Sequence, residues 1–358
     1  MRKIIINGES YARNITGIER VCIETIQELD KICKPGEIEL VIPKNVKHEP
    51  NLTNINIVKL DYEISFFFKW VQIPFQKYVK QQHGISLDFA NNCPYFAPGI
   101  EYLHDIYCKL YPHDFKSKRD KLIRLLSCLM YRRIAKKAKV IIAVSEFTKK
   151  TIVDTYHINP ERIKVIYNGL STSYNNIQPD FSILEKNTQL KAKQFYFTLG
   201  SLSTRKNLKW IAAHAQKNPQ NMYAISGKEL PDVVPTELEV LRNLPNVFFL
   251  GYLSDAEVKA LMIKCKAFIF PSYFEGFGLP PLEALSCGSP IIISSTTCLP
   301  EIYGNTAHYI DPDNTDVDLD KLLSDKVESP EQLLNNLTVK QSALSLYNII
   351  QKYIYDKK

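Results

Sequence analysis

The sequence predicts an α/β protein made of two doubly wound parallel-sheet domains in tandem. Three observations support this fold class. The chain has 358 residues, which is enough for about two domains of ordinary size. Short β-branched runs alternate with segments of helical period, as in parallel βαβ units. The alternation is interrupted over the polar, aperiodic stretch Asn168–Leu190, where we expect the interdomain linker.

The first domain is predicted over residues 1–175 and opens with a β-branched run. Its expected helices include Gly17–Cys33, Lys116–Lys137 and Glu146–Tyr156, and Ser145 is a favourable N-cap for the last of these. Five short runs are the expected strands: Lys3–Ile6, Glu39–Ile42, Leu87–Ala90, Glu101–Leu103 and Val140–Val144.

The second domain is predicted over residues 176–335, where the alternation restarts. The expected strands are Phe195–Leu199, Met222–Ile225, Val247–Leu250, Ala267–Phe270, Ile291–Ser294 and Ala307–Ile310. The expected helices are Asn207–Gln216, Asp255–Lys264 and Leu282–Ser286. Residues 336–358 have a helical pattern, and we expect this segment to pack back on the N-terminal domain. Two such domains place a cleft between the carboxyl ends of their sheets, where open α/β folds bind ligands.

The composition argues against several classes of protein. Hydrophobic residues make up 45% of the chain and charged residues 23%, which is ordinary for a globular protein. The eight cysteines include no C-x-x-C pair, so they suggest neither a zinc site nor a secreted disulfide framework. The start MRKIIING lacks the apolar core of a signal peptide, and the most apolar stretch, Ile64–Phe75, is interrupted by Lys69. We therefore expect a cytoplasmic protein without a membrane-spanning helix.

The most informative segment is the glycine-containing turn between a strand that ends at Phe270 and the helix that follows it. The backbone N–H groups of Gly276–Leu279 and the positive end of the helix dipole form an anion site suited to a diphosphate. Glu283, in about the first turn, can accept hydrogen bonds from ribose hydroxyls, and Glu275 lies on the rim of the cleft. The alternative is a strand–turn–helix corner with two solvated glutamates.

A second motif follows the first strand of the same domain. The loop within Thr198–Asn207 would face the same cleft and offer Arg205 and Lys206 to neutralise phosphate charge. The alternative is a basic helix start without a ligand, which the helix dipole disfavours.

Together these motifs resemble those of a known enzyme family. They are Gly200 with Arg205-Lys206-Asn207, the glutamates Glu275 and Glu283 eight residues apart, Val144–Thr148, Tyr167-Asn168-Gly169, Gly251-Tyr252-Leu253 and Thr16–Arg20. The sequence resembles the retaining, metal-independent nucleotide-sugar glycosyltransferases of family 4 (glycosyl transferases group 1) over nearly its whole length. The resemblance implies the GT-B fold, in which two Rossmann-like domains face a central cleft. The N-terminal domain would bind the acceptor and the C-terminal domain the nucleotide sugar.

The resemblance also implies roles for residues of the second domain. Glu283 would hold the donor ribose, and Glu275 the hydroxyl groups of the transferred sugar. Arg205 and Lys206 would hold the diphosphate, and this chain has Ser201 where many relatives carry a further basic residue. The backbone amides that would contact the sugar and the distal phosphate are those of Gly276, Phe277, Gly278 and Leu279.

Two residues of the first domain complete the expected site. Gly17 would let the backbone of the first domain approach the same phosphates closely, as only glycine permits. His104, at the end of a strand, resembles a family histidine that faces the donor sugar, so it is a candidate catalytic residue beside Glu275, Arg205 and Lys206. The alternative for a single histidine is a structural role.

The resemblance implies transfer with retention by front-face displacement, in which the leaving phosphate accepts the proton of the acceptor. The protein would then act by stabilising negative charge on the diphosphate, without a protein nucleophile, a cofactor or a metal. Two Asp-x-Asp spacings are of the kind found in metal-dependent transferases of another fold, but an ordinary turn followed by a helix N-terminus fits them better. These spacings are Asp311-Pro-Asp313 and Asp316-Val-Asp318-Leu-Asp320.

A strongly basic segment over residues 116–139 contains ten lysines and arginines against Asp120, a net charge of +9. Leu122, Leu125, Leu126, Leu129 and Met130 are interleaved with them. This pattern suits an anionic membrane surface and a lipid-pyrophosphate acceptor, and the aromatic, basic stretch Phe66–Lys80 adds apolar area. A solvated helix face is the alternative. Nucleic acid is not expected, because no recognisable binding motif accompanies the charge.

The sequence thus favours a glycosyltransferase that moves a sugar from a nucleotide-diphosphate donor to a lipid-linked saccharide in surface polysaccharide biosynthesis, such as capsule or lipopolysaccharide. GDP-mannose and UDP-hexose are the favoured donors, with dTDP-rhamnose as a third. The expected location is cytoplasmic, peripheral on the inner face of the membrane. The alternatives are a GT-B nucleotide-sugar epimerase, a transferase to a small soluble acceptor, and a non-catalytic sugar-nucleotide binder.

Overall fold

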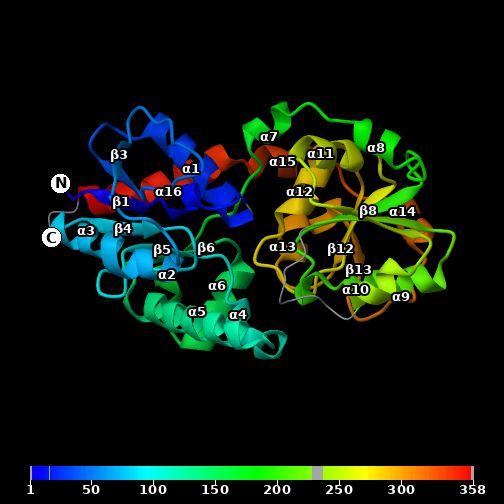
Figure 1. The fold of residues 1–358 in the computed structure, drawn as a ribbon, viewed down its shortest axis with the longest axis horizontal. Helices are drawn as coiled ribbons and strands as arrows, with labels where there is room; N and C mark the ends of the chain where they lie inside the picture. The colour runs from blue at the N-terminus through cyan, green and yellow to red at the C-terminus, as the bar shows by residue number, and fades with distance from the viewer. Residues whose placement is uncertain (1, 16, 228–236, 356–358) are drawn as a thin grey trace. The chain divides into compact units, whose positions relative to one another are not determined.

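The computed structural model describes residues 2–15, 17–227 and 237–355. The chain forms two compact units (Figure 1). Unit 1 comprises Met1–Pro112, Lys121–Ser171 and Leu337–Lys358, and unit 2 comprises His113–Asp120 and Thr172–Asn336.

Unit 1 contains a seven-stranded parallel sheet with the order β3-β2-β1-β4-β5-β6-β7. Ile4 of β1 pairs with Ile38 of β2 on one side and with Ile85 of β4 on the other, so the strand order reverses between β1 and β4. The strands are β1 (Ile4–Asn7), β2 (Ile38–Ile42), β3 (Asn56–Lys59), β4 (Ile85–Asp88), β5 (Ile100–Leu103), β6 (Val140–Ala143) and β7 (Ile163–Val165).

Helices cover both faces of this sheet. On one face, α1 (Gly17–Ile32) packs against α16 (Val339–Ile354), so the last helix of the chain belongs to unit 1 (Figure 1). On the other face lie α2 (Phe67–Trp70), η2 (Val71–Phe75) and α3 (Gln76–Gln81), which run on as one helical segment, with α5 (Lys118–Lys137) and α6 (Glu146–Tyr156). Short helical turns are η1 (Glu9–Ala12), α4 (Tyr107–Leu110) and η4 (Pro160–Arg162). Unit 1 ends within η3 (Pro112–Asp114) and resumes at Lys121, so η3 and α5 each include residues of unit 2.

Unit 2 contains a six-stranded parallel sheet with the order β10-β9-β8-β11-β12-β13, which reverses between β8 and β11. Its strands are β8 (Phe195–Leu199), β9 (Met222–Ser226), β10 (Val247–Gly251), β11 (Ala267–Phe270), β12 (Ile291–Ser294) and β13 (His308–Ile310). Its helices are α7 (Thr172–Asn176), α8 (Ser182–Lys186), η5 (Thr204–Lys206), α9 (Leu208–Lys217), α10 (Glu237–Arg242), α11 (Asp255–Lys264), α12 (Leu279–Ser286), α13 (Leu299–Tyr303), η6 (Gly304–Thr306), α14 (Leu319–Ser324) and α15 (Glu331–Asn336).

The predicted fold class is confirmed, and most expected elements are present within one or two residues. Three elements of unit 1 were not predicted: the strands β3 and β7 and the helix over Phe67–Gln81. The edge strand β3 is mostly exposed and lacks the apolar alternation that marks a half-buried strand. The helix over Phe67–Gln81 contains Pro74, which a helix interior normally rejects, and a π-turn accommodates it here. In the part of the chain that the structure describes, no helix is both long and apolar enough to cross a membrane.

Candidate active site

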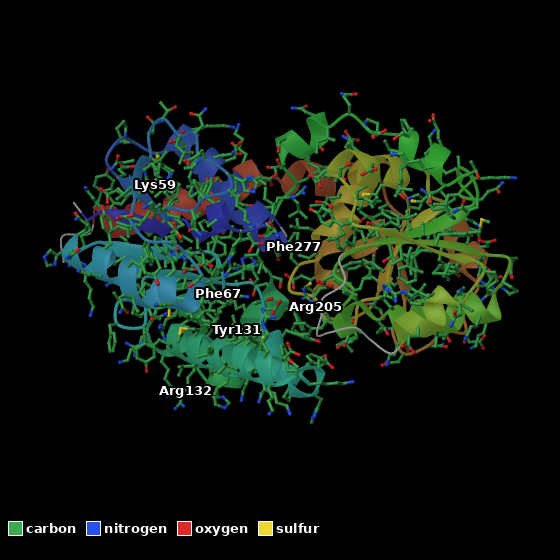
Figure 2. All side chains as sticks on the ribbon, viewed as in Figure 1. Lys59, Phe67, Tyr131, Arg132, Arg205 and Phe277 are labelled. Atoms are coloured by element: carbon green, nitrogen blue, oxygen red, sulfur yellow. The ribbon has the colours of Figure 1, made fainter. Side chains whose placement is uncertain are left out.

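The candidate site of unit 2 lies in the two loops that leave the carboxyl ends of β8 and β11. These strands are neighbours at the point where the strand order reverses. Open α/β sheets bind ligands at this switch point, because adjacent connections leave toward opposite faces and do not cover it. The loops are residues 200–207 and 271–278, and Figure 2 labels one residue of each, Arg205 and Phe277.

The two loops are held together by hydrogen bonds that do not involve the charged side chains. The amide nitrogen of Tyr273 donates to the carbonyl of Arg205 over 3.1 Å. The side-chain Nδ2 of Asn207 donates to the carbonyl oxygens of Pro271 and Pro312, at 3.0 and 2.8 Å. Asn207 is buried and left-handed at φ 56°, a conformation that asparagine tolerates better than most residues. The positions of Arg205 and Lys206 are therefore fixed relative to the second loop.

A buried ion pair links the loops at the centre of the site. Lys206 Nζ lies 2.7 Å from Glu275 Oε1, and Arg205 Nη1 lies 3.9 Å from Glu275 Oε2. The side chain of Glu275 is 7% exposed and that of Lys206 is 12% exposed. Burial by itself would raise the pKa of Glu275, but Lys206 and Arg205 hold it below its ordinary value. Lys206 Nζ also lies 4.5 Å from the ring centroid of Phe270, a cation–π contact.

The second loop ends in α12, which begins earlier than expected. The sequence predicted a start at Leu282, whereas α12 begins at Leu279 because Pro280 and Pro281 occupy first-turn positions that need no N–H partner. Glu283 consequently lies in the second turn, where it is half-buried. Gly278 precedes the helix at φ 84°, and a Cβ there would lie 2.7 Å from Leu299 Cδ2, so the turn requires glycine.

The two expected site residues of the first domain lie in unit 1. Gly17 is the first residue of α1, and a Cβ built on it would meet no atom within 4 Å. His104 is buried at the end of β5, where its Nε2 contacts the carbonyl of Phe89 at 2.7 Å. Burial lowers the pKa of His104, so the ring is neutral at pH 7 and Nε2 acts as the donor in that contact. One ring nitrogen of His104 is therefore occupied by the fold.

Other expectations concern local structure. Ser145 caps α6 by accepting from the amide of Thr148, as predicted. Asp318 caps α14 and Asp311 accepts from the amide of Asp313, so these aspartates form a turn and a helix start as expected. Within the described residues, no three His, Cys, Asp or Glu side chains are grouped so as to hold a metal ion. Ser201 Oγ contacts Ser203 Oγ at 3.2 Å.

Sequence reasoning missed a buried charged cluster at the carboxyl ends of β1 and β4 in unit 1. It consists of Glu9, Arg13, Glu19 and Asp88, and three of the four are almost fully buried. The available signal was a glutamate and an arginine in the loop after the first strand and an aspartate that ends another buried strand. Strand order was needed to bring these together, because β1 and β4 are far apart in the sequence.

Two doubly wound parallel-sheet units, one of them with a cationic switch-point site, are features of the GT-B class of proteins. The family model described as Glycosyl transferases group 1 matches residues 180–338, and the model described as Glycosyltransferase Family 4 matches residues 15–174. The chain therefore belongs to the family 4 (group 1) glycosyltransferases.

Several curated relatives are similar to parts of the chain. O-antigen chain mannosyltransferase B of Escherichia coli is 30% identical over 188 residues, which is 50% of this chain and 49% of that protein. O-antigen chain mannosyltransferase RfbU of Salmonella typhimurium is 28% identical over 259 residues, 71% of this chain and 65% of that protein. The matched stretch thus spans about half to two thirds of the length of these relatives.

Solved structures show the same fold at low sequence identity. Sucrose-phosphate synthase from Thermosynechococcus elongatus has a TM-score of 0.72 at 15% identity and covers 99% of both chains. HepE from Anabaena, solved with UDP, has a TM-score of 0.63 at 18% identity over 99% of this chain and 98% of its own. WaaG, described as a glycosyltransferase involved in lipopolysaccharide biosynthesis, has a TM-score of 0.63 at 15% identity over 98% of both chains.

Proposed function

We propose that this protein is a retaining glycosyltransferase of surface polysaccharide biosynthesis, and that it transfers mannose from GDP-mannose to a lipid-linked saccharide. The observation that carries the proposal is the ion pair of Lys206 with Glu275, flanked by Arg205 at the switch point of unit 2. Two cations beside one carboxylate give the site a net positive charge, which suits the diphosphate of a nucleotide sugar.

Binding of the donor would replace this ion pair with contacts to the donor. The diphosphate would pair with Lys206 and Arg205, and Glu275 would then accept hydrogen bonds from hydroxyl groups of the transferred sugar. The backbone amides of Gly276–Leu279 and the N-terminus of α12 would contribute further donors to the distal phosphate. Glu283, half-buried on the same helix, would hold the ribose.

The proposed chemistry needs no protein nucleophile. The bond between the anomeric carbon and the diphosphate oxygen breaks, and the acceptor oxygen forms its bond on the same face of the sugar. The acceptor proton passes to the leaving phosphate oxygen. Lys206 and Arg205 stabilise the charge that develops on the diphosphate, which is electrostatic catalysis by preorganised groups. Two fixed cations supply the charge that a divalent metal supplies elsewhere, and we propose that no metal is required.

The relatives support mannose as the transferred sugar. O-antigen chain mannosyltransferase B and RfbU are both named as mannosyltransferases of O-antigen, and each matches half of this chain or more. UDP-hexose and dTDP-rhamnose are the alternative donors. Unit 1 would bind the acceptor saccharide.

The exposed face of α5 supports peripheral contact with an anionic membrane through residues 116–139. Three leucines on this face are exposed, Leu122 by 54%, Leu125 by 63% and Leu129 by 45%. The other interleaved residues, Leu126 and Met130, face the core of unit 1 instead. Tyr131 is buried whereas Arg132 is exposed, and Figure 2 shows the two on opposite sides of α5. The exposed face at helical spacing reads Lys118, Leu122, Leu125, Leu129, Arg132 and Lys136.

This face has the composition of an interfacial helix. An apolar centre about two turns long is flanked by basic residues at both ends, so leucines can enter the acyl boundary while lysines and arginines reach lipid phosphates. Three exposed leucines on one helix face do not stabilise a surface that contacts only water, so they favour an interaction at this face.

The proposed donor specificity is tested by thermal unfolding of the full chain with GDP, UDP and dTDP, since a ligand that binds the native state raises Tm. We expect GDP to give the largest shift, and Glu283→Ala to abolish it. A product assay with GDP-mannose and lipid extract follows. Binding without any turnover would support the non-catalytic binder, turnover only to free sugars the soluble-acceptor transferase, and interconversion of donor sugars the epimerase. No shift with any nucleotide would refute the site assignment.

A further inference from the structure

Side chains of one neighbouring segment hold three carbonyl groups of the loop over residues 271–278. This segment runs from the end of β12 into α13, both labelled in Figure 1. The donor and acceptor pairs are Ser294 Oγ with the carbonyl of Ser272, Cys298 Sγ with that of Glu275, and the hydroxyl of Tyr303 with that of Gly278. The first two bonds span 2.6 and 3.3 Å. Every third carbonyl of the loop is therefore fixed from the same side chain segment.

The three donors are buried, so water does not compete for the carbonyls. Ser294 and Cys298 are 0% exposed, and Tyr303 is 1% exposed. The strands β11 and β12 are paired neighbours, with Phe270 opposite Ile293, so the loop and the segment leave adjacent strands. The contacts between them therefore belong to the framework of unit 2.

The hydroxyl of Ser294 has a defined direction. Its Oγ lies 3.0 Å from Thr296 Oγ1 as well as 2.6 Å from the carbonyl of Ser272. A carbonyl only accepts, so the single proton of Ser294 goes to Ser272 and Thr296 donates to Ser294. The serine thus uses both its donor and an acceptor position to hold the start of the loop.

Bonds to carbonyls also set the directions of backbone amides. In a planar trans peptide, the N–H of a residue points opposite to the carbonyl of the residue before it. The loop shows this relation at Ser272, whose carbonyl faces Ser294 while the next amide, that of Tyr273, donates to the carbonyl of Arg205 over 3.1 Å. At this peptide, the donor segment and the loop that carries Arg205 therefore lie on opposite sides.

The same relation holds for two amides of the candidate phosphate site. The carbonyl of Glu275 faces Cys298, so the amide of Gly276 points away from that thiol. The carbonyl just before α12 faces Tyr303, so the amide of Leu279 points away from that hydroxyl. The β12–α13 segment thus determines where these two amides are directed.

We infer that Ser294, Cys298 and Tyr303 are positioning residues that direct the amides of Gly276 and Leu279 toward the distal phosphate of the donor. This inference rests on the proposed function, because it concerns how the phosphate site of that reaction is held. The three side chains act through the carbonyls of the loop. Amides fixed before the reaction stabilise the charge that develops on a leaving diphosphate without reorganising.

The test compares nucleoside diphosphates with monophosphates, because only the diphosphates carry a distal phosphate. The full chain is titrated calorimetrically with GDP and GMP, and with UDP and UMP in parallel. Tyr303→Phe removes one hydroxyl and keeps the ring. We expect it to weaken diphosphate binding about threefold or more, as for the loss of one well-placed hydrogen bond, and to leave monophosphate binding unchanged.

Cys298→Ala and Cys298→Ser test the second donor of the segment. The alanine variant should weaken diphosphate binding to a similar extent, because the carbonyl of Glu275 loses its thiol partner. The serine variant keeps a donor and should restore most of the affinity. These variants change another element than Tyr303→Phe, so each serves if the other fails to fold.

Tyr223→Phe is the matched control. Tyr223 is 1% exposed, and its hydroxyl contacts His214 Nδ1 at 2.6 Å, away from the loop over residues 271–278. We expect this variant to lower Tm as Tyr303→Phe does, but to keep the ratio of diphosphate to monophosphate affinity. The ratio therefore separates positioning of the amides from a general loss of stability.

The outcomes distinguish this inference from the proposed function. If the wild type binds a diphosphate and the affinity ratio is unchanged in Tyr303→Phe and Cys298→Ala, the inference is overturned and the nucleotide site stands. Equal weakening of diphosphate and monophosphate also overturns it. Absence of binding of all four nucleotides by the wild type would overturn the proposed function, and the inference with it.

Discussion

Replacing Glu275 with glutamine should tighten the binding of a nucleoside diphosphate while it abolishes sugar transfer. In the ligand-free protein, Lys206 is paired with Glu275 at 2.7 Å, and a phosphate that binds Lys206 must compete with this carboxylate. A nucleoside diphosphate has no sugar whose hydroxyls would satisfy Glu275 in return. Binding of the diphosphate to the wild-type protein therefore costs the free energy of the broken ion pair, whereas the sugar of the complete donor compensates for this loss.

The size of the effect follows from the geometry of the pair. A hydrogen bond to a charged group contributes about 1.5–3 kcal/mol and a neutral one about 0.5–1.5 kcal/mol, so glutamine holds Lys206 less tightly by about 1–2 kcal/mol. Because Lys206 of the variant is held less tightly before the diphosphate binds, this difference in free energy lowers the Kd for the diphosphate about 5- to 30-fold. The free variant should also be less stable, by up to about 3 kcal/mol, because a buried cation loses its counterion.

Calorimetric titration with the diphosphate that binds the wild type gives the Kd, and thermal unfolding gives the stability. Glu331→Gln, an exposed carboxylate of the same unit, is the control and should change neither quantity. The reasoning fails if Glu275→Gln binds the diphosphate equally or more weakly than the wild type.

Three further predictions test other parts of the molecule. Asn207→Ala should lower the free energy of unfolding of unit 2, measured with denaturant, by about 2–4 kcal/mol, because two hydrogen bonds are lost and alanine is strained in the left-handed conformation. Asn207→Gly should cost about 1 kcal/mol less, since glycine adopts this conformation without strain. Equal losses in the two variants would contradict the backbone contribution. Burial, with Glu9 nearby, raises the pKa of Asp88 to about 7, so the stability held by its protonated form is lost as pH rises from about 4 to 7. Asp88→Asn removes this titration but replaces one hydrogen-bond acceptor by a donor, so its effect on Tm should be more favourable at pH 8 than at pH 5, and parallel Tm curves would rule this out. Replacing Leu122, Leu125 and Leu129 with serine should reduce flotation with anionic vesicles at least tenfold, whereas Leu344→Ser, an equally exposed leucine on α16, should not.

The sequence was sufficient where local pattern decides the structure. Strands such as Phe195–Leu199 and Ala267–Phe270 occur with the predicted bounds, because continuous apolar runs between helices are typical of central parallel strands. Helix α11, with its capping box at Ser254 and Glu257, also has the predicted bounds. These elements need no information from distant parts of the chain.

Long-range pairing was less accessible to sequence reasoning. Arg205, Lys206 and Glu275 were predicted to act on one ligand, but their mutual ion pair in the free protein was not, because it joins residues 69 positions apart. The cluster around Arg13 was missed for the same reason, since Asn7 and Asp88 are separated by 81 positions. In α5 the interleaved leucines suggested one apolar face, whereas tertiary packing partly buries Leu126 and leaves Leu125 exposed.

The two units use the same topological position with opposite charge. At the switch point of unit 2, two cations lie beside one carboxylate; at that of unit 1, Glu9 and Glu19 are paired with one guanidinium, and Asp88 is a third carboxyl group in the cluster. The topology of a doubly wound sheet determines where a ligand binds but not whether the site is positively or negatively charged, because the loop residues after each strand determine the charge. Excess positive charge favours a diphosphate, whereas Glu9 and Glu19 at the switch point of unit 1 are already paired with Arg13. The residues of the loops, rather than the strand order, are therefore the reason for proposing that the nucleotide sugar binds unit 2.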